Sequence, residues 1–267
     1  MRKKKNFTDT DDAIQNALGL LAKLGHHYID EYVIGKGWSN RRLKRDWYYA
    51  FKYCLSYTYY QGRSESLSKR YCDAMQVFLD KYFGTHPEAV LRRLWNQNGI
   101  PHDASWTDFA KSKSRLWGEF NSSMGKGRDL EMVLDILRYV YKLPNHNIVA
   151  HSVDEIKSGR IRNQRDDLRT IWSVGPKISA FYLRDVVFLF DCKIAANDIS
   201  AIFPVDTWVS QVVKRLRQHV GDTSKQSEAD WFLEKASARY DAGILNAGAW
   251  YLGAHSFDLY LESLFPE

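Results

Sequence analysis

The sequence predicts an all-α protein, and three observations lead to this fold class. The chain has only six prolines in 267 residues, and several long stretches contain none. Apolar residues recur at helical spacing in most of those stretches. The alternating apolar and polar pattern of a half-buried strand, bounded by turn residues, occurs nowhere. We therefore expect helices throughout, including residues 186–190, whose Val, Phe and Leu run continues a helical pattern.

The predicted helices of the first half are separated by short breaks at glycine and proline. They cover residues 11–33, 46–61, 64–83, 88–98, 104–121 and 129–143. A loop rich in Gly, Ser and Arg is expected at 35–42. The segment 129–143 has the clearest amphipathic pattern in the chain, and Pro144 ends it.

In the second half, residues 145–165 are polar, with a short apolar turn at Ile148 and Val149. A tight turn at 173–176 separates two further predicted helices. The last helices are expected at 205–219, 228–239 and 243–264. No repeat, low-complexity tract or clean linker interrupts the chain.

The composition favours a packed protein with an anionic partner. Hydrophobic residues make up 45% and aromatic residues 14% of the chain, which is enough for a sizeable core. Nine Trp, sixteen Tyr and thirteen Phe exceed what that core needs, so some rings should lie on surfaces or line a pocket. The net charge of +6 favours nucleic acid, although the basic segment 1–5 contributes part of it.

Cysteine usage and hydropathy limit the classes of protein and site. Only three cysteines occur, which excludes a four-cysteine iron–sulfur cluster and gives no support to a structural zinc site. We expect no metal and no organic cofactor. No segment resembles a signal peptide or approaches transmembrane length, so we expect a soluble monomer inside the cell, in the cytoplasm, nucleoid or nucleus.

The turn Ser173-Val174-Gly175-Pro176 lies between a helix that buries Leu168 and Ile171 and a helix that begins at Lys177. Such a turn directs backbone N–H groups and a helix N-terminus at one point, where a phosphate can bind without regard to base sequence. The alternative interpretation is an ordinary helix–helix connection, for which Gly and Pro are common.

Lys177 and Asp206 are the two residues whose chemistry stands out. A helix N-terminus disfavours a cation, so its field, together with burial, would favour the neutral amine of Lys177, which is the nucleophilic form. Asp206 follows Phe203-Pro204-Val205 and opens a helix with an apolar stripe. It can stabilise a positively charged sugar, or it can serve as a plain N-cap. Lys177 can likewise serve as a phosphate contact or point into water.

These two segments together resemble the helix-hairpin-helix DNA glycosylase superfamily, which includes endonuclease III and 8-oxoguanine DNA glycosylase. That family has a hairpin of the form L-P-G-V-G-x-K and a later V-D-T-H or V-D-x-H. Here they read I-W-S-V-G-P-K and P-V-D-T-W, with Lys177 at the nucleophile and Asp206 at the essential aspartate. Weaker likeness extends over residues 46–257. The separation of Lys177 and Asp206 is longer than usual, with an insert around 191–202 that would form a loop or a longer helix.

The resemblance implies two helical subdomains flanking a DNA-binding cleft. One would comprise residues 1–45 and 203–267, and the other residues 46–202 with the helix-hairpin-helix at 166–187. Double-stranded DNA with a damaged or modified base would be the partner. The implied DNA contacts are Ser173, Val174 and Gly175 of the hairpin, and Gln61, with Tyr59 and Tyr60 as alternatives, would fill the gap left by a flipped base.

The implied reaction is base excision. Lys177 would displace the base at C1′ and leave a Schiff base, and β-elimination would then nick the strand, which is an apurinic-site lyase activity. A monovalent cation on the hairpin carbonyls is also implied. Rings that would stack on the flipped base are Trp208, Phe181, Tyr182 and Trp250.

The lysine favours an oxidised base such as 8-oxoguanine, by family analogy alone. Two alternatives stay open: a glycosylase for another modified base, and a non-catalytic DNA-binding protein that keeps the hairpin as a phosphate clamp. A helical interaction module, in which the aromatic residues form a partner surface, is a more distant third.

Overall fold

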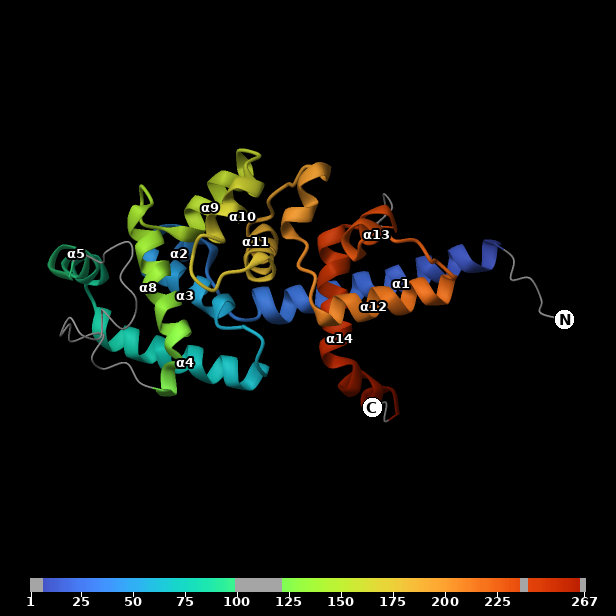
Figure 1. Ribbon diagram of the computed structural model, residues 1–267, viewed down its shortest axis with the longest axis horizontal. Coiled ribbons are helices and arrows are strands. Elements are labelled where there is room, and N and C mark those ends of the chain that lie inside the picture. The colour runs from blue at the N-terminus through green and yellow to red at the C-terminus, as the bar shows by residue number, and fades with distance from the viewer. Residues whose placement is uncertain (1–6, 99–121, 236–239, 265–267) are drawn as a thin grey trace. The chain divides into compact units, whose positions relative to one another are not determined.

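The computed structural model describes residues 7–98, 122–235 and 240–264, and every regular element in these ranges is helical (Figure 1). The all-α prediction is therefore confirmed for the described residues. The α-helices are α1 (Phe7–Tyr28), α2 (Asn40–Arg45), α3 (Trp47–Thr58), α4 (Glu65–Phe83), α5 (Pro87–Asn98), α8 (Gly127–Lys142), α9 (Ile148–Lys157), α10 (Ile161–Leu168), α11 (Pro176–Phe190), α12 (Thr207–Val220), α13 (Glu228–Lys235) and α14 (Ala242–Leu264). A π-helical segment, η1 (Ile29–Ile34), continues α1, and 3-10 turns occur at η2 (Ser122–Met124) and η3 (Ala196–Ile202).

Most predicted helices occur near their expected positions, and residues 186–190 are helical as the end of α11. Two expectations were wrong. The loop expected at 35–42 already contains the start of α2, and the polar segment 145–165 contains α9 and the start of α10. The insert after α11 forms the turn η3, and the helix expected at 104–121 lies outside the described residues.

The sequence contains the cause of the missed helix α9. Asn147 caps it, with the side-chain oxygen accepting the backbone N–H of Ala150 at 2.8 Å. The buried stripe of α9 comprises Ile148, Val149, Val153 and Ile156. The rest of α9 is polar, so the composition of the segment 145–165 did not indicate a helix, and this helix was missed.

The chain divides into two compact units. Unit 1 comprises Met1–Gly37 and Ile194–Glu267, and unit 2 comprises Trp38–Lys193. The sequence analysis placed the corresponding boundaries after residues 45 and 202. Each unit has its own buried apolar residues and is described separately.

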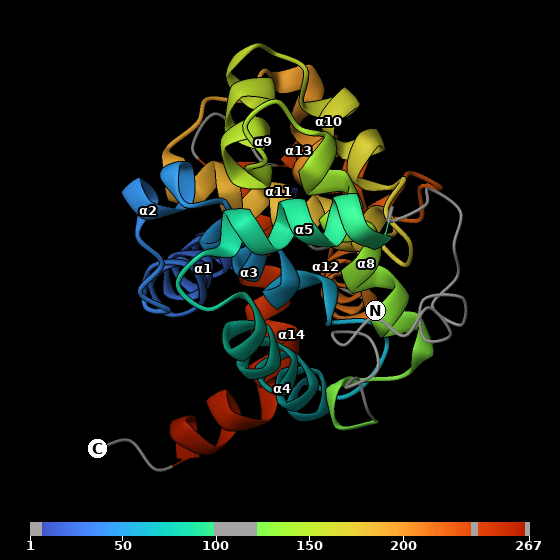
Figure 2. The same ribbon diagram turned by 90° about the vertical axis from the view of Figure 1, so that its left-hand side faces the viewer.

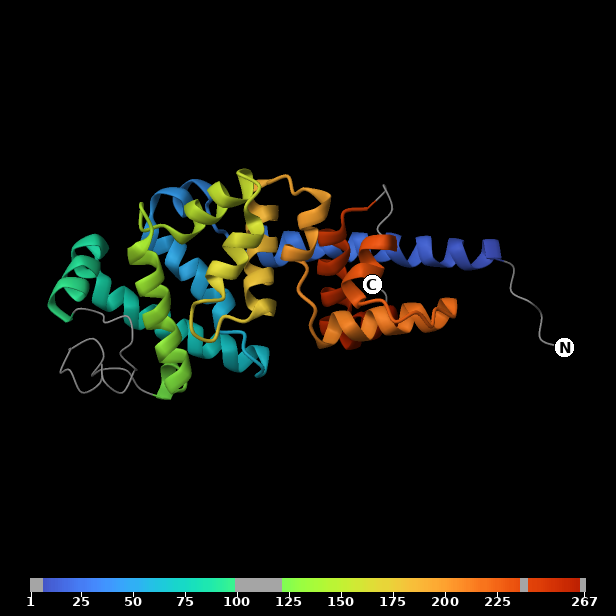
Figure 3. The ribbon, with the colours of Figure 1, turned by 45° about the horizontal axis from the view of Figure 1, so that its top comes forward.

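Unit 1 is built on a close approach of α1 and α14, with α12 packed beside α14 (Figures 1 and 3). Two glycines allow this approach. A Cβ atom at Gly248 would lie 1.8 Å from the backbone oxygen of Leu21, and one at Gly25 would lie 2.2 Å from that of Ile244. Both distances are far below van der Waals contact, so any side chain at these positions would force the helices apart.

Unit 2 packs α9 against both α10 and α11 (Figure 2). It also buries the rings of α3 against the end of α4. Trp47 and Tyr48 both contact Phe83, with ring centroids 5.8 Å and 5.1 Å apart. Met132, Val133, Leu134, Ile136 and Leu137 of α8 are all fully buried. The amphipathic pattern that predicted α8 therefore corresponds to a buried apolar face that packs against α3.

Two further findings concern the described residues as a whole. None of their helices combines the length and the apolar character needed to cross a membrane. Cys54, Cys72 and Cys192 are free thiols, all buried, and burial raises the pKa of Cys54 to about 12.

We predict that Gly248→Ala lowers the free energy of unfolding by about 3 kcal/mol or more, because its methyl group cannot be accommodated against Leu21. Denaturant unfolding followed by helical circular dichroism measures this loss. Gly127→Ala is the matched control, because a Cβ atom there meets no other atom within 4 Å. Equal stability of the Gly248 variant and the unmodified protein would contradict the packing of α1 on α14.

Candidate functional site

The connection 169–175 between α10 and α11 is a compact turn held by its own backbone. The N–H of Thr170 donates to the carbonyl of Asp167 at 3.0 Å, and that of Val174 donates to the carbonyl of Ile171 at 3.0 Å. Ser173 has φ of 64°, in the left-handed region that a non-glycine residue adopts at a cost of about 1 kcal/mol. Val174 is buried, so the turn is anchored by one apolar side chain.

Asp135 of α8 fixes the turn from outside. One carboxylate oxygen accepts the backbone N–H of Trp172 at 2.9 Å, and the other accepts Nη1 of Arg138 at 2.6 Å. The backbone of Trp172 is therefore held by α8, while its ring is exposed. The sequence analysis did not identify Asp135, and its position on the amphipathic helix gives no signal for this contact.

Lys177 is the second residue of α11, after Pro176 and the extended N-cap Gly175. Pro176 suits this place because the first turn of a helix has no use for its missing N–H. Within the described part of the chain, the side chain of Lys177 and the backbone N–H groups of Gly175 and Lys177 have no hydrogen-bond partner. The side chain is partly exposed. Two backbone N–H donors and one ammonium group therefore lie together at the N-terminus of α11.

A buried polar network ties α10 and α11 to α9. The amide of Gln164 donates to the hydroxyl of Ser152 at 2.8 Å, and that hydroxyl lies 3.2 Å from the hydroxyl of Tyr182. All three side chains are buried, and burial holds the pKa of Tyr182 well above its usual value. Tyr182, expected as a ring that stacks on a base, is therefore a core residue in contact with Tyr53 and Tyr57.

Asp206 is the N-cap of α12. Its carboxylate accepts the backbone N–H of Val209 at 2.9 Å, and the group is partly exposed. The preceding segment is fixed by the buried amide of Asn246, which donates to the carbonyl of Pro204 at 2.9 Å. The capping role considered in the sequence analysis is thus present, and it uses one of the two carboxylate oxygens.

Three of the expected stacking rings have some exposure. Trp208 is 41% exposed, and its Cβ lies over Gly253 of α14. Trp250 is partly buried and meets Tyr28 edge-on, with ring centroids 5.4 Å apart. Phe181 is partly buried, and Cζ of the Arg184 guanidinium lies over its ring, 4.7 Å from the ring centroid. Trp208 is therefore the most accessible of the expected rings.

Gln61 follows the end of α3 and is partly exposed. Its side-chain amide donates to the carbonyl of Thr58 at 2.7 Å and contacts the sulfur of Met132. Arg128 donates to the backbone carbonyl of Gln61 at 3.2 Å. Of the two alternatives, Tyr59 is fully buried, whereas Tyr60 is partly exposed, as Gln61 is.

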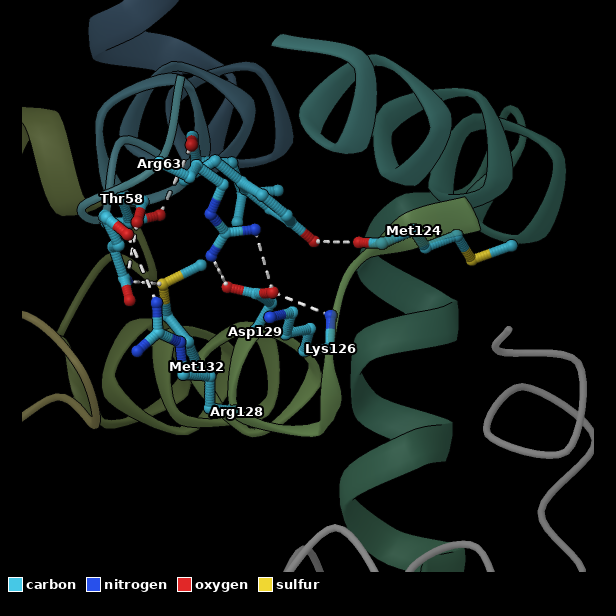
Figure 4. Close-up of polar contacts among 10 residues, drawn as sticks. Thr58, Arg63, Met124, Lys126, Arg128, Asp129 and Met132 are labelled. Carbon is cyan, nitrogen blue, oxygen red and sulfur yellow. Dashed lines mark hydrogen bonds and ion pairs between the residues drawn. The ribbon is translucent and has the colours of Figure 1, made fainter. Parts of the chain in front are cut away.

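A buried ion pair next to Gln61 was missed by the sequence analysis. The guanidinium of Arg63 binds both carboxylate oxygens of Asp129, which is fully buried, and the backbone N–H of Lys126 donates to the same carboxylate at 2.7 Å (Figure 4). Two bonds in parallel from one guanidinium give a rigid connection. The pair therefore fixes the segment that carries Gln61 to the start of α8. An acidic residue in the first turn of a helix was its only sequence signal.

The expected site residues are divided between the two units. Unit 2 contains Lys177, Ser173, Val174, Gly175, Gln61, Phe181 and Tyr182, and unit 1 contains Asp206, Trp208 and Trp250. Among the described residues, no group of three or more His, Cys, Asp or Glu side chains is arranged to hold a metal ion.

Comparison with known proteins adds no relative. No protein-family model matches the chain, and no curated protein and no solved structure is significantly similar to it.

Proposed function

We propose that this protein is a DNA base-excision glycosylase with apurinic-site lyase activity, acting on an oxidised base such as 8-oxoguanine. The observation that carries the proposal is the position of Lys177. It lies in the first turn of α11 and is partly exposed, and it has no described partner for its side chain. A cation in this place opposes the helix dipole, and no described hydrogen bond or ion pair accounts for it, so we assign it a chemical role.

The turn before Lys177 supports DNA as the partner. Ser173 has the left-handed backbone conformation that glycine adopts at the lowest cost. Glycine is the residue that the helix-hairpin-helix glycosylases have at this place of their hairpin. The unbonded N–H groups of Gly175 and Lys177, together with the helix start, suit a phosphate oxygen.

In the proposed reaction, the neutral amine of Lys177 attacks C1′ of the flipped nucleotide. The bond from C1′ to the base breaks, and the base leaves with the bonding electrons and takes up a proton. The C1′–O4′ bond then breaks, O4′ keeps the bonding electrons and takes up the proton that the attacking amine gives up, and a protonated Schiff base joins C1′ to Lys177. Loss of a proton from C2′ then expels the 3′ phosphate and nicks the strand.

Asp206 is proposed to stabilise the positive charge that develops on the sugar and to help activate the amine. Its capping bond to Val209 occupies one oxygen and leaves the second available for this role. The same bond favours a second candidate, a non-catalytic DNA-binding protein, because it gives Asp206 a sufficient structural purpose.

Lys177→Gln should abolish base excision, with a loss of about a thousandfold or more, while affinity for undamaged duplex changes little. Borohydride should trap a covalent protein–DNA adduct with the unmodified protein and with Lys142→Gln, a lysine of α8 that serves as the matched control. The Lys177 variant should give no adduct. Base release without a trapped adduct for any lesion would instead indicate attack by water, and an adduct with the Lys177 variant would exclude Lys177 as the nucleophile.

Two substitutions separate the charge of Asp206 from its cap. Asn caps a helix as well as Asp does, so Asp206→Asn should keep the unfolding temperature and still lose most of the excision rate. Asp206→Ala should lose the rate and also about 1 kcal/mol of unfolding free energy. Single-turnover kinetics and thermal unfolding give the two readouts. Full activity of the Asn variant would show that the carboxylate acts only as a cap.

A further inference from the structure

A second concentration of positive charge lies in unit 2, at the end of α11 away from Lys177. The short helix α2 contributes Arg41, Arg42, Lys44 and Arg45, all exposed, in five consecutive positions. The middle position of the five is Leu43, which is fully buried. One apolar anchor therefore holds the helix while its basic side chains remain in solvent.

Hydrogen bonds to neighbouring helices fix α2 in place. The side-chain amide of Asn40 donates to the carbonyl of Leu189 in α11 at 2.5 Å, and the buried amide of Asn147 donates to the carbonyl of Leu43 at 2.9 Å. The ammonium group of Lys44 lies 5.2 Å from the ring centre of Phe190, the last residue of α11. These contacts make α2 a fixed platform at the end of α11.

Two more lysines extend this positive surface. Lys157 ends α9, and Lys193 follows α11; both are exposed. The helix α9, which Lys157 ends, packs against α2, and Lys193 directly follows Cys192. Burial raises the pKa of Cys192, and the charges of Lys157 and Lys44 oppose that rise. We call the six residues Arg41, Arg42, Lys44, Arg45, Lys157 and Lys193 the basic patch.

Neighbouring acidic groups and helix ends offset the charge of the basic patch only in part. Arg42 pairs with Asp46, at 3.0 Å, but the other five have no carboxylate within ion-pair distance among the residues that the structure describes. Exposed Asp154 and Asp191 lie on the adjoining elements and reduce the charge without forming such pairs. The C-terminal ends of α2, α9 and α11 offset about half a charge each, which leaves an excess of positive charge.

Like charges three or four residues apart on α2 destabilise it by a few tenths of a kcal/mol per pair, which opposes the stabilisation that cations in the last turn of α2 receive from the helix dipole. A regular polyanion would compensate the positive charges of the basic patch.

We propose that the basic patch binds the phosphates of duplex DNA at a place separate from the α10–α11 connection. The proposal rests on the proposed function for its choice of DNA. Because α11 has 15 residues, the two places are about one helix length, or 22 Å, apart.

The test compares two triple variants that remove the same charge. Arg41→Gln, Lys44→Gln and Arg45→Gln together remove half of the basic patch. Lys81→Gln, Arg92→Gln and Arg93→Gln, exposed positions on α4 and α5, form the control. Fluorescence anisotropy measures the affinity of each for undamaged duplex DNA across a range of salt concentrations, after circular dichroism has confirmed folding.

The patch variant should bind at least about tenfold more weakly at low salt, and its plot of log affinity against log salt should be shallower by up to about 3, while the control changes much less. Lys157→Gln with Lys193→Gln, which leaves α2 intact, should give a smaller loss in the same direction. Equal losses in both triple variants would show an effect of net charge alone and would overturn the proposal, as would no loss in the patch variant.

The outcome separates this proposal from the proposed function. Patch-dependent binding by a protein that excises no lesion would keep the basic patch and contradict the glycosylase. Excision of a lesion by a protein whose DNA affinity does not change with the patch substitutions would support the glycosylase and contradict the role of the basic patch. Failure of every form to bind duplex DNA would overturn both.

Discussion

The hydrogen bonds of Gln164 and Ser152 are the interaction on which the candidate site depends. The hydroxyl of Ser152, on α9, contacts both helices of the pair. It accepts a hydrogen bond from Gln164 of α10, and it lies within hydrogen-bond distance of the hydroxyl of Tyr182 of α11. A buried amide that loses its partner costs about 1–3 kcal/mol, so the two helices hold their positions together. Asp135 adds a bond to the backbone of Trp172. The start of α11, with Lys177, is consequently presented by a rigid framework.

In unit 1, close helix packing at glycines and one buried hydrogen bond fix the position of Asp206. Gly25 and Gly248 let α1 and α14 touch backbone to backbone, and Gly253 receives the side chain of Trp208. The bond from Asn246 to Pro204 then fixes the residues that lead into Asp206. Small residues and one buried amide thus position a carboxylate and an exposed indole. These residues do no chemistry in the proposed reaction, but Asp206 depends on them for its place.

Periodic apolar patterns were sufficient to predict α8 and the helices around residues 173–176, because those segments have apolar residues at helical spacing. They were insufficient for α9, whose short apolar stripe lies within the otherwise polar segment 145–165, and for the π-helical η1, which has no sequence signature. The burial of Tyr182 depends on Ser152, and the pairing of Arg63 with Asp129 joins residues that are distant in sequence. Such contacts are decided by tertiary packing, so a single sequence does not reveal them. Lys177 and Asp206 could be singled out because their chemistry conflicts with, or exceeds, their local structural purpose.

The central claim is that a lysine at the start of α11 removes a damaged base from DNA. A panel of duplexes, each with a single lesion, tests it most directly: oxidised purines, oxidised pyrimidines, alkylated bases and modified bases, incubated with the protein and analysed with and without alkali. The account predicts that at least one oxidised base is released and that its strand is broken without alkali. Release of no base from any duplex, together with salt-dependent binding of the same DNA, would contradict it and leave a non-catalytic DNA-binding protein.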